Sequence, residues 1–387
     1  MKLAFVTIFD ANDRDSWSGL GFHMRQALES RGIQIEVIDN LRHGRSIPRR
    51  LRKMWARRIE NRSISHFWDI DTAKGYAKTV EKHLQGLAVD AVLSAAPIPI
   101  AYLRTTLPKI LWTDANFSAL SSSYPEFGPG RLSKSALRHG RALERQAEST
   151  CQLIIYASEW ARQISVSHGY CVDSSRIKVV PLAANMTVEH SLKDVAQLDA
   201  GRDQGVIKLL FIGIDWYRKG GAKAVAIAQD IREKGYKVEL TVVGCTPPQA
   251  GQLPEFVKVL GFISKASIEG RMLLAKLFSE SHFLLVPTTA ETFGLVFAEA
   301  SAFGVPSFSH RIGGVPAVVR DGANGFLFDV DQPISDWSEF IVSLFNDKAR
   351  MRALAISCFE EYTRRLNWNV ASREAVALIE QTITGEV

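Results

Sequence analysis

Cysteine is scarce in this sequence, and the few cysteines present lie far apart. The 387 residues include four, Cys151, Cys171, Cys245 and Cys358, with no Cys-x-x-Cys pair among them. This spacing argues against a zinc knuckle or a disulfide scaffold and fits a reducing compartment. The nine histidines show no His-Glu-x-x-His pattern, so the sequence contains no recognisable zinc-protease motif.

Long apolar runs are absent as well. No run approaches the roughly 18 residues that a helix needs to cross a bilayer. The apolar segment 1–9 is short and ends at Asp10, and no small-residue cleavage site follows it. We therefore interpret this segment as a first strand and not as a signal peptide. We expect a cytoplasmic protein, with a peripheral position on the inner face of the membrane as an option.

The basic excess of the chain is concentrated in one segment. The net charge is +6, and residues 42–62 hold nine Lys or Arg against a single acid, Glu60. Outside this segment, which we call the basic arm, 38 bases face 40 acids. Hydrophobic residues make up 46% of the chain and charged residues 23%, as in a globular protein long enough for two domains.

The basic arm has helical spacing of apolar residues, at Ile47, Leu51, Met54 and Trp55. Such a segment could lie in a membrane interface, with its cations on anionic head groups. It could equally be a surface helix whose apolar stripe packs on its own domain. A nucleic-acid partner is a third option, but no nucleic-acid motif supports it, and we expect none.

Short apolar strands alternate with helical stretches along the whole chain. In the first half, strands are predicted at 3–9, 34–38, 90–94, 109–112, 153–157 and 177–181, and helices at 19–31, 72–84 (capped by Asp71), 133–148 and 159–168. After the polar segment 185–206, strands are predicted at 207–212, 237–243, 256–260, 282–287 and 307–310, and helices at 221–234, 266–279, 295–303 and after Trp368. This alternation predicts an α/β fold with two parallel, doubly wound sheets, which bind ligands at the carboxyl ends of their strands.

Two glutamates flank the entrance of the helix predicted at 295–303. Glu291 lies in the loop before this helix, Glu299 lies on its second turn, and Gly294 is at its entrance. Free amides in the first turn of a helix suit an anionic or hydroxyl-rich ligand. Carboxylates on either side can accept hydrogen bonds from sugar hydroxyls. The alternative is that both glutamates are ordinary solvated residues near a helix terminus.

The stretch Glu291-Thr-Phe-Gly-Leu-Val-Phe-Ala-Glu299 resembles the E-x7-E signature of group 1 glycosyltransferases (glycosyltransferase family 4), which are retaining enzymes with the GT-B fold. The resemblance implies two Rossmann-like domains that face each other across a cleft. We expect an N-terminal acceptor-binding domain over 1–184, a linker over 185–206 and a C-terminal nucleotide-sugar-binding domain over 207–366. A last helix over 367–387 would cross back to the N-terminal domain.

Further segments of the C-terminal half resemble the same family. Gly213, followed by a loop with Arg218 and Lys219, resembles the element in which a lysine contacts the donor diphosphate, although Ile214 and Asp215 stand where the family commonly has an arginine. The 260–263 stretch, with Phe262 and Ile263, resembles the loop that packs on the nucleotide base. The segments 313–316 and 321–326 match the family's Gly-Gly-x-Pro-Glu and Gly-x-x-Gly-Phe patterns, with Ala317 in place of the glutamate.

The N-terminal half matches the family more thinly. The Ser18-Gly-Leu-Gly21 stretch resembles the glycine loop that approaches the donor phosphates, with Gly19 and Gly21. A dinucleotide fingerprint would need a third glycine near position 24, where Met24 stands, so NAD binding is disfavoured. Asp114 occupies the loop where many members have a histidine beside the donor sugar.

The resemblance implies a metal-independent, retaining hexosyltransferase that uses a nucleotide-diphosphate sugar and needs no other cofactor. Asp69-Ile-Asp71 is a DxD pattern, but it precedes a predicted helix and has no second ligand cluster, so we assign no metal site. The implied acceptor is a glycan or a lipid-linked precursor. Alternatives are another GT-B chemistry, such as a sugar-nucleotide epimerase, and a non-catalytic membrane or nucleic-acid binder. The expected catalytic residues are Glu291, Lys219, Arg218 and Asp114, and the expected donor-binding residues are Gly19, Gly21, Gly213, Phe262, Ile263, Phe293, Gly294, Leu295 and Glu299.

Overall fold

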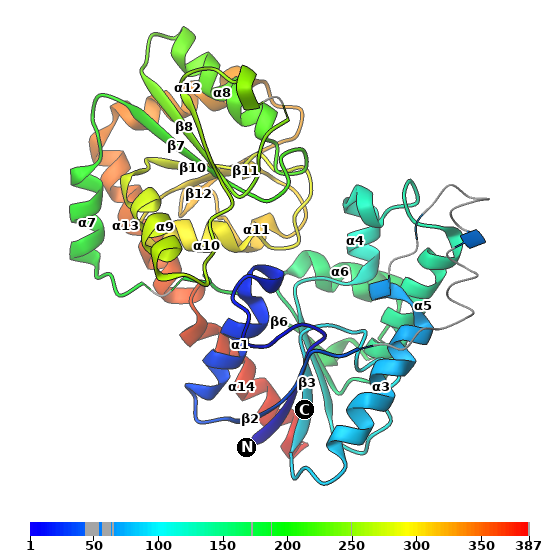
Figure 1. Cartoon of the computed structure of the whole chain (residues 1–387). Coiled ribbons are helices and arrows are strands. Elements are labelled where there is room, and N and C mark those ends of the chain that lie inside the picture. The colour runs from blue at the N-terminus through cyan, green and yellow to red at the C-terminus, as the bar shows by residue number, and fades with distance from the viewer. Residues whose placement is uncertain are drawn as a thin grey trace. The chain divides into compact units, whose positions relative to one another are not determined.

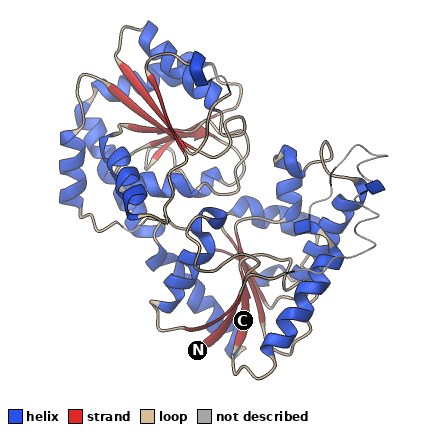
Figure 2. Cartoon of the chain, viewed as in Figure 1, coloured by secondary structure: helices blue, strands red, loops and turns tan. Residues whose placement is uncertain are grey.

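The chain divides into two compact units, each built around its own sheet (Figure 1). The computed structural model describes residues 1–42, 54–55, 63, 66–171, 173–186, 188–248 and 250–385. Unit 1 consists of Met1–Pro181 and Ala371–Val387, and unit 2 of Leu182–Val370. Figure 2 shows strands in the interior of each unit and helices around them.

Unit 1 contains a six-stranded sheet in the order β2-β1-β3-β4-β5-β6. Every pairing in it is parallel. The strands are β1 (Lys2–Val6), β2 (Gln34–Ile38), β3 (Ala91–Ser94), β4 (Lys109–Thr113), β5 (Leu153–Tyr156) and β6 (Ile177–Val179). The central strands are buried along their whole length, as expected for a parallel sheet with helices on both faces.

Several helices of unit 1 begin at side-chain caps. The helices of this unit are α1 (Leu20–Glu29), α3 (Ile70–Leu84), α4 (Phe117–Ser123), α5 (Lys134–Thr150), α6 (Glu159–His168) and most of α14 (Trp368–Thr384). Ser133 accepts a hydrogen bond from the Ala136 amide at the start of α5, and Ser158 does the same for Ala161 at the start of α6. Each such cap stabilises its helix by about 1 kcal/mol.

The cap of α3 differs from the one predicted. The sequence pattern placed Asp71 at the cap, but Asp69 is the N-cap residue, and its carboxylate accepts from the Thr72 amide at 3.1 Å. The predicted cap was therefore wrong by two residues, and Asp71 lies in the first turn of α3. Asp69 is 1% exposed and its carboxylate lies 3.3 Å from His139 Nδ1.

Unit 2 contains a second six-stranded parallel sheet, in the order β12-β11-β10-β7-β8-β9. Its strands are β7 (Ile207–Ile212), β8 (Val238–Val243), β9 (Val257–Gly261), β10 (Phe283–Leu285), β11 (Ser307–His310) and β12 (Gly325–Phe328). Its helices are α7 (Leu192–Gly201), α8 (Gly221–Glu233), α9 (Ile268–Glu280), α10 (Leu295–Ala302), α11 (Val315–Val318), α12 (Ile334–Asn346) and α13 (Lys348–Arg365). The predicted α/β class with two doubly wound parallel sheets is confirmed.

Residues 185–206, predicted to be a linker, contain helix α7. Ser191 and Asp194 form a capping box at its start. Val195 on this helix packs with Ala355 and Phe359 of α13 in a small apolar cluster. Helix α7 is therefore part of the packing of unit 2.

Most of the basic arm lies outside the described residues, and the helix predicted there with it. Of its apolar positions, Met54 and Trp55 are described, and they are 50% and 60% exposed. Across the described ranges, every helix is too short or too polar to cross a membrane.

Candidate functional site

The candidate site lies at the carboxyl ends of two central strands of the unit 2 sheet. Strands β7 and β10 are parallel neighbours, with Phe283 paired to Leu209. Their carboxyl ends therefore lie side by side, and the loop before α8 (213–220) meets the loop before α10 (286–294). Ligands of doubly wound sheets bind at the carboxyl ends of such strands.

The loop between β7 and α8 is a compact turn organised by Asp215. The Asp215 carboxylate accepts from the amides of Tyr217 and Arg218, each at 3.0 Å. The Lys219 amide donates to the Asp215 carbonyl at 3.0 Å. Asp215 stands where the family that the chain resembles commonly has an arginine. Because its carboxylate holds this turn, Arg218 and Lys219 are still directed into the site.

Glycines at both ends of this turn allow close packing. A Cβ at Gly213 would lie 2.6 Å from Lys219 Cγ, so the lysine stem lies directly over the end of β7. Gly220 has a φ of +77°, and a Cβ there would lie 2.0 Å from the Pro287 carbonyl oxygen. The two loops are thus in backbone contact, which only glycine permits at Gly220.

Arg218, Lys219 and Glu291 form a buried charged cluster. Lys219 Nζ and Glu291 Oε2 are in direct ion-pair contact, and Arg218 Nη1 lies 3.7 Å from the same oxygen. Lys219 is 8% exposed and Glu291 7%. The structure therefore brings together three of the four residues predicted to be catalytic.

The loop that carries Glu291 is tied to the backbone of Arg218. The hydroxyl of Thr288 and the amide of Thr289 donate to the Arg218 carbonyl at 3.1 and 2.8 Å. In return, Arg218 Nη1 donates to the Ala290 carbonyl at 2.9 Å. Displacement of either loop would therefore displace the other.

The Gly313-Gly314 pair packs against the backbone of Glu291 and Thr292. The Gly314 amide donates to the Glu291 carbonyl at 2.9 Å. A Cβ at Gly313, whose φ is +53°, would lie 2.2 Å from that same carbonyl oxygen, and a Cβ at Gly314 would lie 1.7 Å from the Thr292 carbonyl. Neither position has room for a side chain.

Helix α10 begins beside this cluster. Gly294 is its N-cap residue, with a φ of +92° that favours glycine. Phe293 is buried and Leu295 half-buried, and every later residue of α10 is buried. The first-turn amides of α10 follow directly after the loop that bears Glu291.

Glu299 has a partner that the sequence analysis missed. It is 2% exposed, and its Oε1 is in direct ion-pair contact with Lys265 Nζ, from the loop after β9. Lys265 follows Phe262 and Ile263, the residues predicted to pack on the nucleotide base; Phe262 is 64% exposed and Ile263 half-buried. The position of Lys265 two residues after the 260–263 stretch was the available signal in the sequence, but a lone lysine in a loop has no distinctive pattern.

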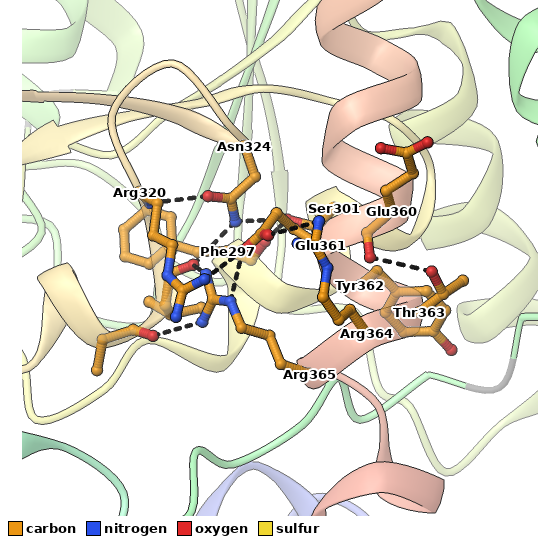
Figure 3. A network of polar contacts seen from close by, with 12 residues as sticks. Phe297, Ser301, Arg320, Asn324, Glu360, Glu361, Tyr362, Thr363, Arg364 and Arg365 are labelled. Atoms are coloured by element: carbon orange, nitrogen blue, oxygen red, sulfur yellow. Dashed lines mark hydrogen bonds and ion pairs between the residues drawn. The ribbon is translucent and has the colours of Figure 1, made fainter.

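A polar network joins the segment after Gly314 to helices α10 and α13 (Figure 3). Arg365 donates to the carbonyls of Ala317 and Val318 at 2.6 and 3.0 Å. Asn324 donates to the Ser301 hydroxyl at 3.0 Å and to the Val318 carbonyl at 2.8 Å. The buried Glu361 accepts from Arg365 at 2.5 Å and lies 3.4 Å from Arg320. This network fixes the backbone that supports Glu291.

The remaining predicted residues, Gly19, Gly21 and Asp114, belong to unit 1. Gly19 ends a run of three residues with positive φ, at +49° for Trp17, +55° for Ser18 and +80° for Gly19. A Cβ at Gly19 would lie 2.7 Å from the Arg14 carbonyl oxygen. Asp114 is half-buried directly after β4. Each therefore follows the carboxyl end of a strand, at the ligand-binding edge of its own sheet.

Within the described ranges, His, Cys, Asp and Glu side chains nowhere gather in a group of three that could hold an ion. Asp69 of the DxD pattern serves as the cap of α3. This pattern therefore has a structural role in the fold of unit 1.

A model of the family described as Glycosyl transferases group 1 matches residues 207–347. This range contains the charged cluster, helix α10 and the Gly313-Gly314 support. This part of the chain is therefore similar to the group 1 glycosyltransferases.

Curated proteins similar to this chain include D-inositol 3-phosphate glycosyltransferases. The protein of that name from Corynebacterium kroppenstedtii is 26% identical over 259 residues, which is 63% of this chain and 56% of the relative. The one from Nocardia farcinica is 27% identical over 215 residues, 53% of this chain and 47% of the relative. The match therefore spans about half the length of these relatives.

Solved glycosyltransferase structures share the whole fold. Sucrose-phosphate synthase from Thermosynechococcus elongatus has a TM-score of 0.72 at 16% identity, covering 100% of both chains. HepE from Anabaena, solved in complex with UDP and glucose, has a TM-score of 0.64 at 16% identity, covering 98% of this chain and 100% of its own. The predicted GT-B fold class is thereby confirmed.

Proposed function

We propose that this chain is a group 1 glycosyltransferase that transfers a sugar from a nucleotide-diphosphate sugar to an acceptor. The observation that carries the proposal is the meeting of Arg218, Lys219 and Glu291 in front of helix α10. Two cations and a carboxylate at the ligand-binding edge of a parallel sheet suit a donor with a diphosphate at one end and sugar hydroxyls at the other.

The cations would act on the leaving group. As the bond between sugar and diphosphate breaks, negative charge grows on the phosphate oxygens. Lys219 and Arg218 are held in a largely buried place, where an opposite charge is stabilised more strongly than in water. Because Lys219 contacts Glu291, the donor phosphates would share or take over that ammonium. This arrangement would neutralise the diphosphate without a metal ion or any other cofactor.

The carboxylates would orient the donor. Glu291 and the amides of Phe293 and Gly294 would bind the sugar hydroxyls, and Glu299 would bind the ribose hydroxyls. Phe262 and Ile263 would pack on the base, while Gly213 and Leu295 would border the phosphates. Lys265, which contacts Glu299, would lie at the ribose end of the donor.

Retention of configuration is part of the proposal, as the family resemblance implies. The sequence offers no clear nucleophile beside the cluster, so the acceptor would attack on the face that the diphosphate leaves, and the leaving phosphate would help to deprotonate it. Asp114, Gly19 and Gly21 of unit 1 would serve the acceptor and the donor phosphates. The proposed acceptor is a glycan or a lipid-linked precursor of an envelope polysaccharide, reached at the inner face of the membrane.

Thermal-shift screening against nucleotide sugars tests the proposal. UDP-sugars are the first choice because HepE was solved with UDP and glucose, and GDP- and ADP-sugars complete the panel. A donor at about 100 times its Kd adds roughly 2.7 kcal/mol of stability. We expect one base to stabilise the wild type, with EDTA present, and to stabilise Glu299→Ala far less.

The same panel separates the alternatives. A sugar-nucleotide epimerase would convert the nucleotide sugar with no acceptor present. A non-catalytic binder of membranes or nucleic acid would show no stabilisation by any nucleotide sugar, and that result would overturn the proposal. Stabilisation that disappears with EDTA would overturn its metal-independent part.

A further inference from the structure

His310 is buried at the carboxyl end of β11 and bonded on both ring nitrogens. It is 2% exposed. Its Nδ1 lies 2.9 Å from the Thr288 carbonyl oxygen, and its Nε2 lies 2.9 Å from Lys223 Nζ on α8. The imidazole therefore joins helix α8 to the loop that carries Glu291.

The chemistry of the two partners determines where the ring proton lies. A carbonyl oxygen can only accept, so His310 must carry its proton on Nδ1. A lysine ammonium can only donate, so Nε2 must be the acceptor. Lys223 Nζ also reaches the carbonyls of Val330 and Gln332 at 3.3 and 3.4 Å, which gives its three protons three acceptors. The pair is thus a neutral imidazole beside a charged lysine.

Two further hydrogen bonds connect Thr288 to the charged cluster. The Thr288 hydroxyl donates to the Arg218 carbonyl at 3.1 Å and is placed 3.0 Å from the Ala290 carbonyl. Arg218 in turn donates to Ala290 and lies beside Glu291. A continuous chain of hydrogen bonds therefore runs from Lys223 to the residues that would hold the donor.

Packing confines the pair. The Trp337 ring meets the His310 ring edge-on, with centroids 5.2 Å apart, and Lys223 Nζ lies 5.0 Å from the Trp337 centroid. Burial lowers the pKa of His310; the bond to the Thr288 carbonyl opposes this shift, and the nearby Lys223 cation adds to it. Burial also lowers the pKa of Lys223.

The other charged groups in this region lie beyond the pair. Asp331 acts on Lys223 and favours its charged form. Arg311, the residue after His310, pairs with Asp321 and lies 3.9 Å from Asp329. Thr288 and Trp337, which contact the imidazole directly, are neutral. Lys223 is therefore the charge that opposes protonation of His310.

We propose that Lys223 and His310 form a positioning pair that holds the 286–291 loop in its donor-binding arrangement and releases it in acid. This inference rests on the proposed function for the role of the loop, but not for the pair itself. When a proton binds His310 at Nε2, the ring loses its acceptor and faces a second cation. The bond to Lys223 is then replaced by repulsion, so the imidazole, which still donates from Nδ1 to Thr288, no longer ties the loop to helix α8.

The first test needs no ligand. Long-range proton–nitrogen NMR of the full chain at about pH 7.5 should show His310 as the Nδ1–H tautomer. The Thr289 amide, which donates to Arg218, should be protected from hydrogen exchange. After correction for intrinsic rates, its protection should fall in acid, at a pH below the ordinary histidine pKa of about 6.5. An Nε2–H tautomer, or protection independent of pH, would overturn the pair.

Two variants separate positioning from mere packing. In His310→Asn, which keeps a donor near the Nδ1 position but cannot titrate, the acid loss of Thr289 protection should disappear. In Lys223→Met, which keeps the stem on Trp337 but has neither the bond nor the charge, protection of Thr289 should be lower at neutral pH and the further loss in acid should disappear. The control His83→Asn changes an exposed histidine of α3 and should leave the profile unchanged. Identical profiles in wild type and both variants would contradict the inference.

The consequence for turnover is measured with the nucleotide sugar selected by the thermal-shift panel. Hydrolysis of this donor by the wild type should show a kcat that falls about tenfold per pH unit on the acid side, as expected for one essential unprotonated group. His310→Asn should lack this limb and have a lower kcat at neutral pH, with the larger change in kcat and not in KM. If no nucleotide sugar binds, the proposed function fails, while the tautomer and exchange results still decide whether the pair exists.

Discussion

At the scale of single residues, each glutamate of the E-x7-E stretch has its own lysine. Glu291 contacts Lys219 from the loop before α8, and Glu299 contacts Lys265 from the loop after β9. Both carboxylates are more than nine-tenths buried. A buried carboxylate without a partner is costly, so the two lysines also stabilise the site itself. The two glutamates are therefore distinguishable by substitution.

Glu299→Ala should weaken binding of the nucleotide, because the ribose hydroxyls lose a charged acceptor worth about 1.5–3 kcal/mol. Glu291→Ala should leave nucleoside diphosphate affinity close to that of the wild type and abolish most turnover, because Glu291 would bind only the sugar. Titration calorimetry with the diphosphate and an activity assay measure the two effects. If both variants bind and turn over like the wild type, the roles of these glutamates are wrong.

Lys219→Ala should lower kcat more than it raises the KM for the donor. The reason is that charge grows on the diphosphate only as the bond breaks, so the lost interaction belongs mainly to the transition state. Removal of one such donor typically costs about 100-fold or more in kcat. Lys276→Ala, at an exposed lysine of α9, is the matched control. A pure KM effect would assign Lys219 to ground-state binding.

At the scale of elements, the alternation of strands and helices was readable from the sequence. Strands β2, β7 and β11 and helix α6 have the predicted bounds, because each is an apolar or capped stretch between clear turn residues. Helices α4, α7, α11, α12 and α13 and strand β12 were not predicted. Helix α7, for example, is polar, and only its contact with α13 buries Val195.

Some residues of the candidate site could be found from the sequence, and others could not. Motifs that are continuous in sequence, such as Glu291 to Glu299, could be found because their spacing is local. Pairs between distant segments could not, since Lys265 and Glu299 are 34 residues apart and Lys223 and His310 are 87 apart. Only the order of the strands brings such pairs together. Arg218 was found from its loop, but its bond to Ala290 follows from the pairing of β7 with β10.

Helix α5 buries two glutamates close to one another. Glu144 and Glu148 lie one turn apart and fully buried. Glu144 accepts from the Phe117 amide at 2.9 Å, and Glu148 accepts from the Tyr156 hydroxyl at 2.7 Å. Burial, and then the Glu148 charge, raise the pKa of Glu144 well above its usual range. The folded state thus keeps a proton that the unfolded chain loses.

Glu144→Gln should therefore stabilise the protein increasingly as pH rises above about 4.5, the usual pKa of a glutamate. In the wild type, stability falls with pH from that value up to the raised folded pKa, by at most about 1.4 kcal/mol per pH unit for one group. Glutamine cannot ionise and can still accept from Phe117. Denaturant unfolding at a series of pH values measures the difference, with the exposed Glu374→Gln as control. A variant equally or less stable than the wild type at neutral pH would show that Glu144 is ionised at little cost.

At the scale of the whole molecule, charge is distributed unevenly. Of the 47 Lys and Arg residues, nine lie in the basic arm, and the rest of the chain is close to neutral. We propose that the chain associates with an anionic surface through this one segment and not through the protein as a whole. A lipid-linked acceptor would be such a case, because the arm would hold unit 1 at the membrane where the acceptor lies.

The arm should therefore bind membranes by charge, with an apolar contribution from Met54 and Trp55, which are exposed. We expect the wild type to sediment with vesicles that contain anionic lipid, and less so as salt rises, because each basic residue near such a surface contributes about 1 kcal/mol that salt screens. The variant Arg49→Glu/Arg50→Glu/Arg52→Glu/Lys53→Glu should lose this binding and keep donor hydrolysis unchanged, since none of the four belongs to the donor site. Equal sedimentation with anionic and neutral vesicles at low salt would leave the arm without a role at the membrane.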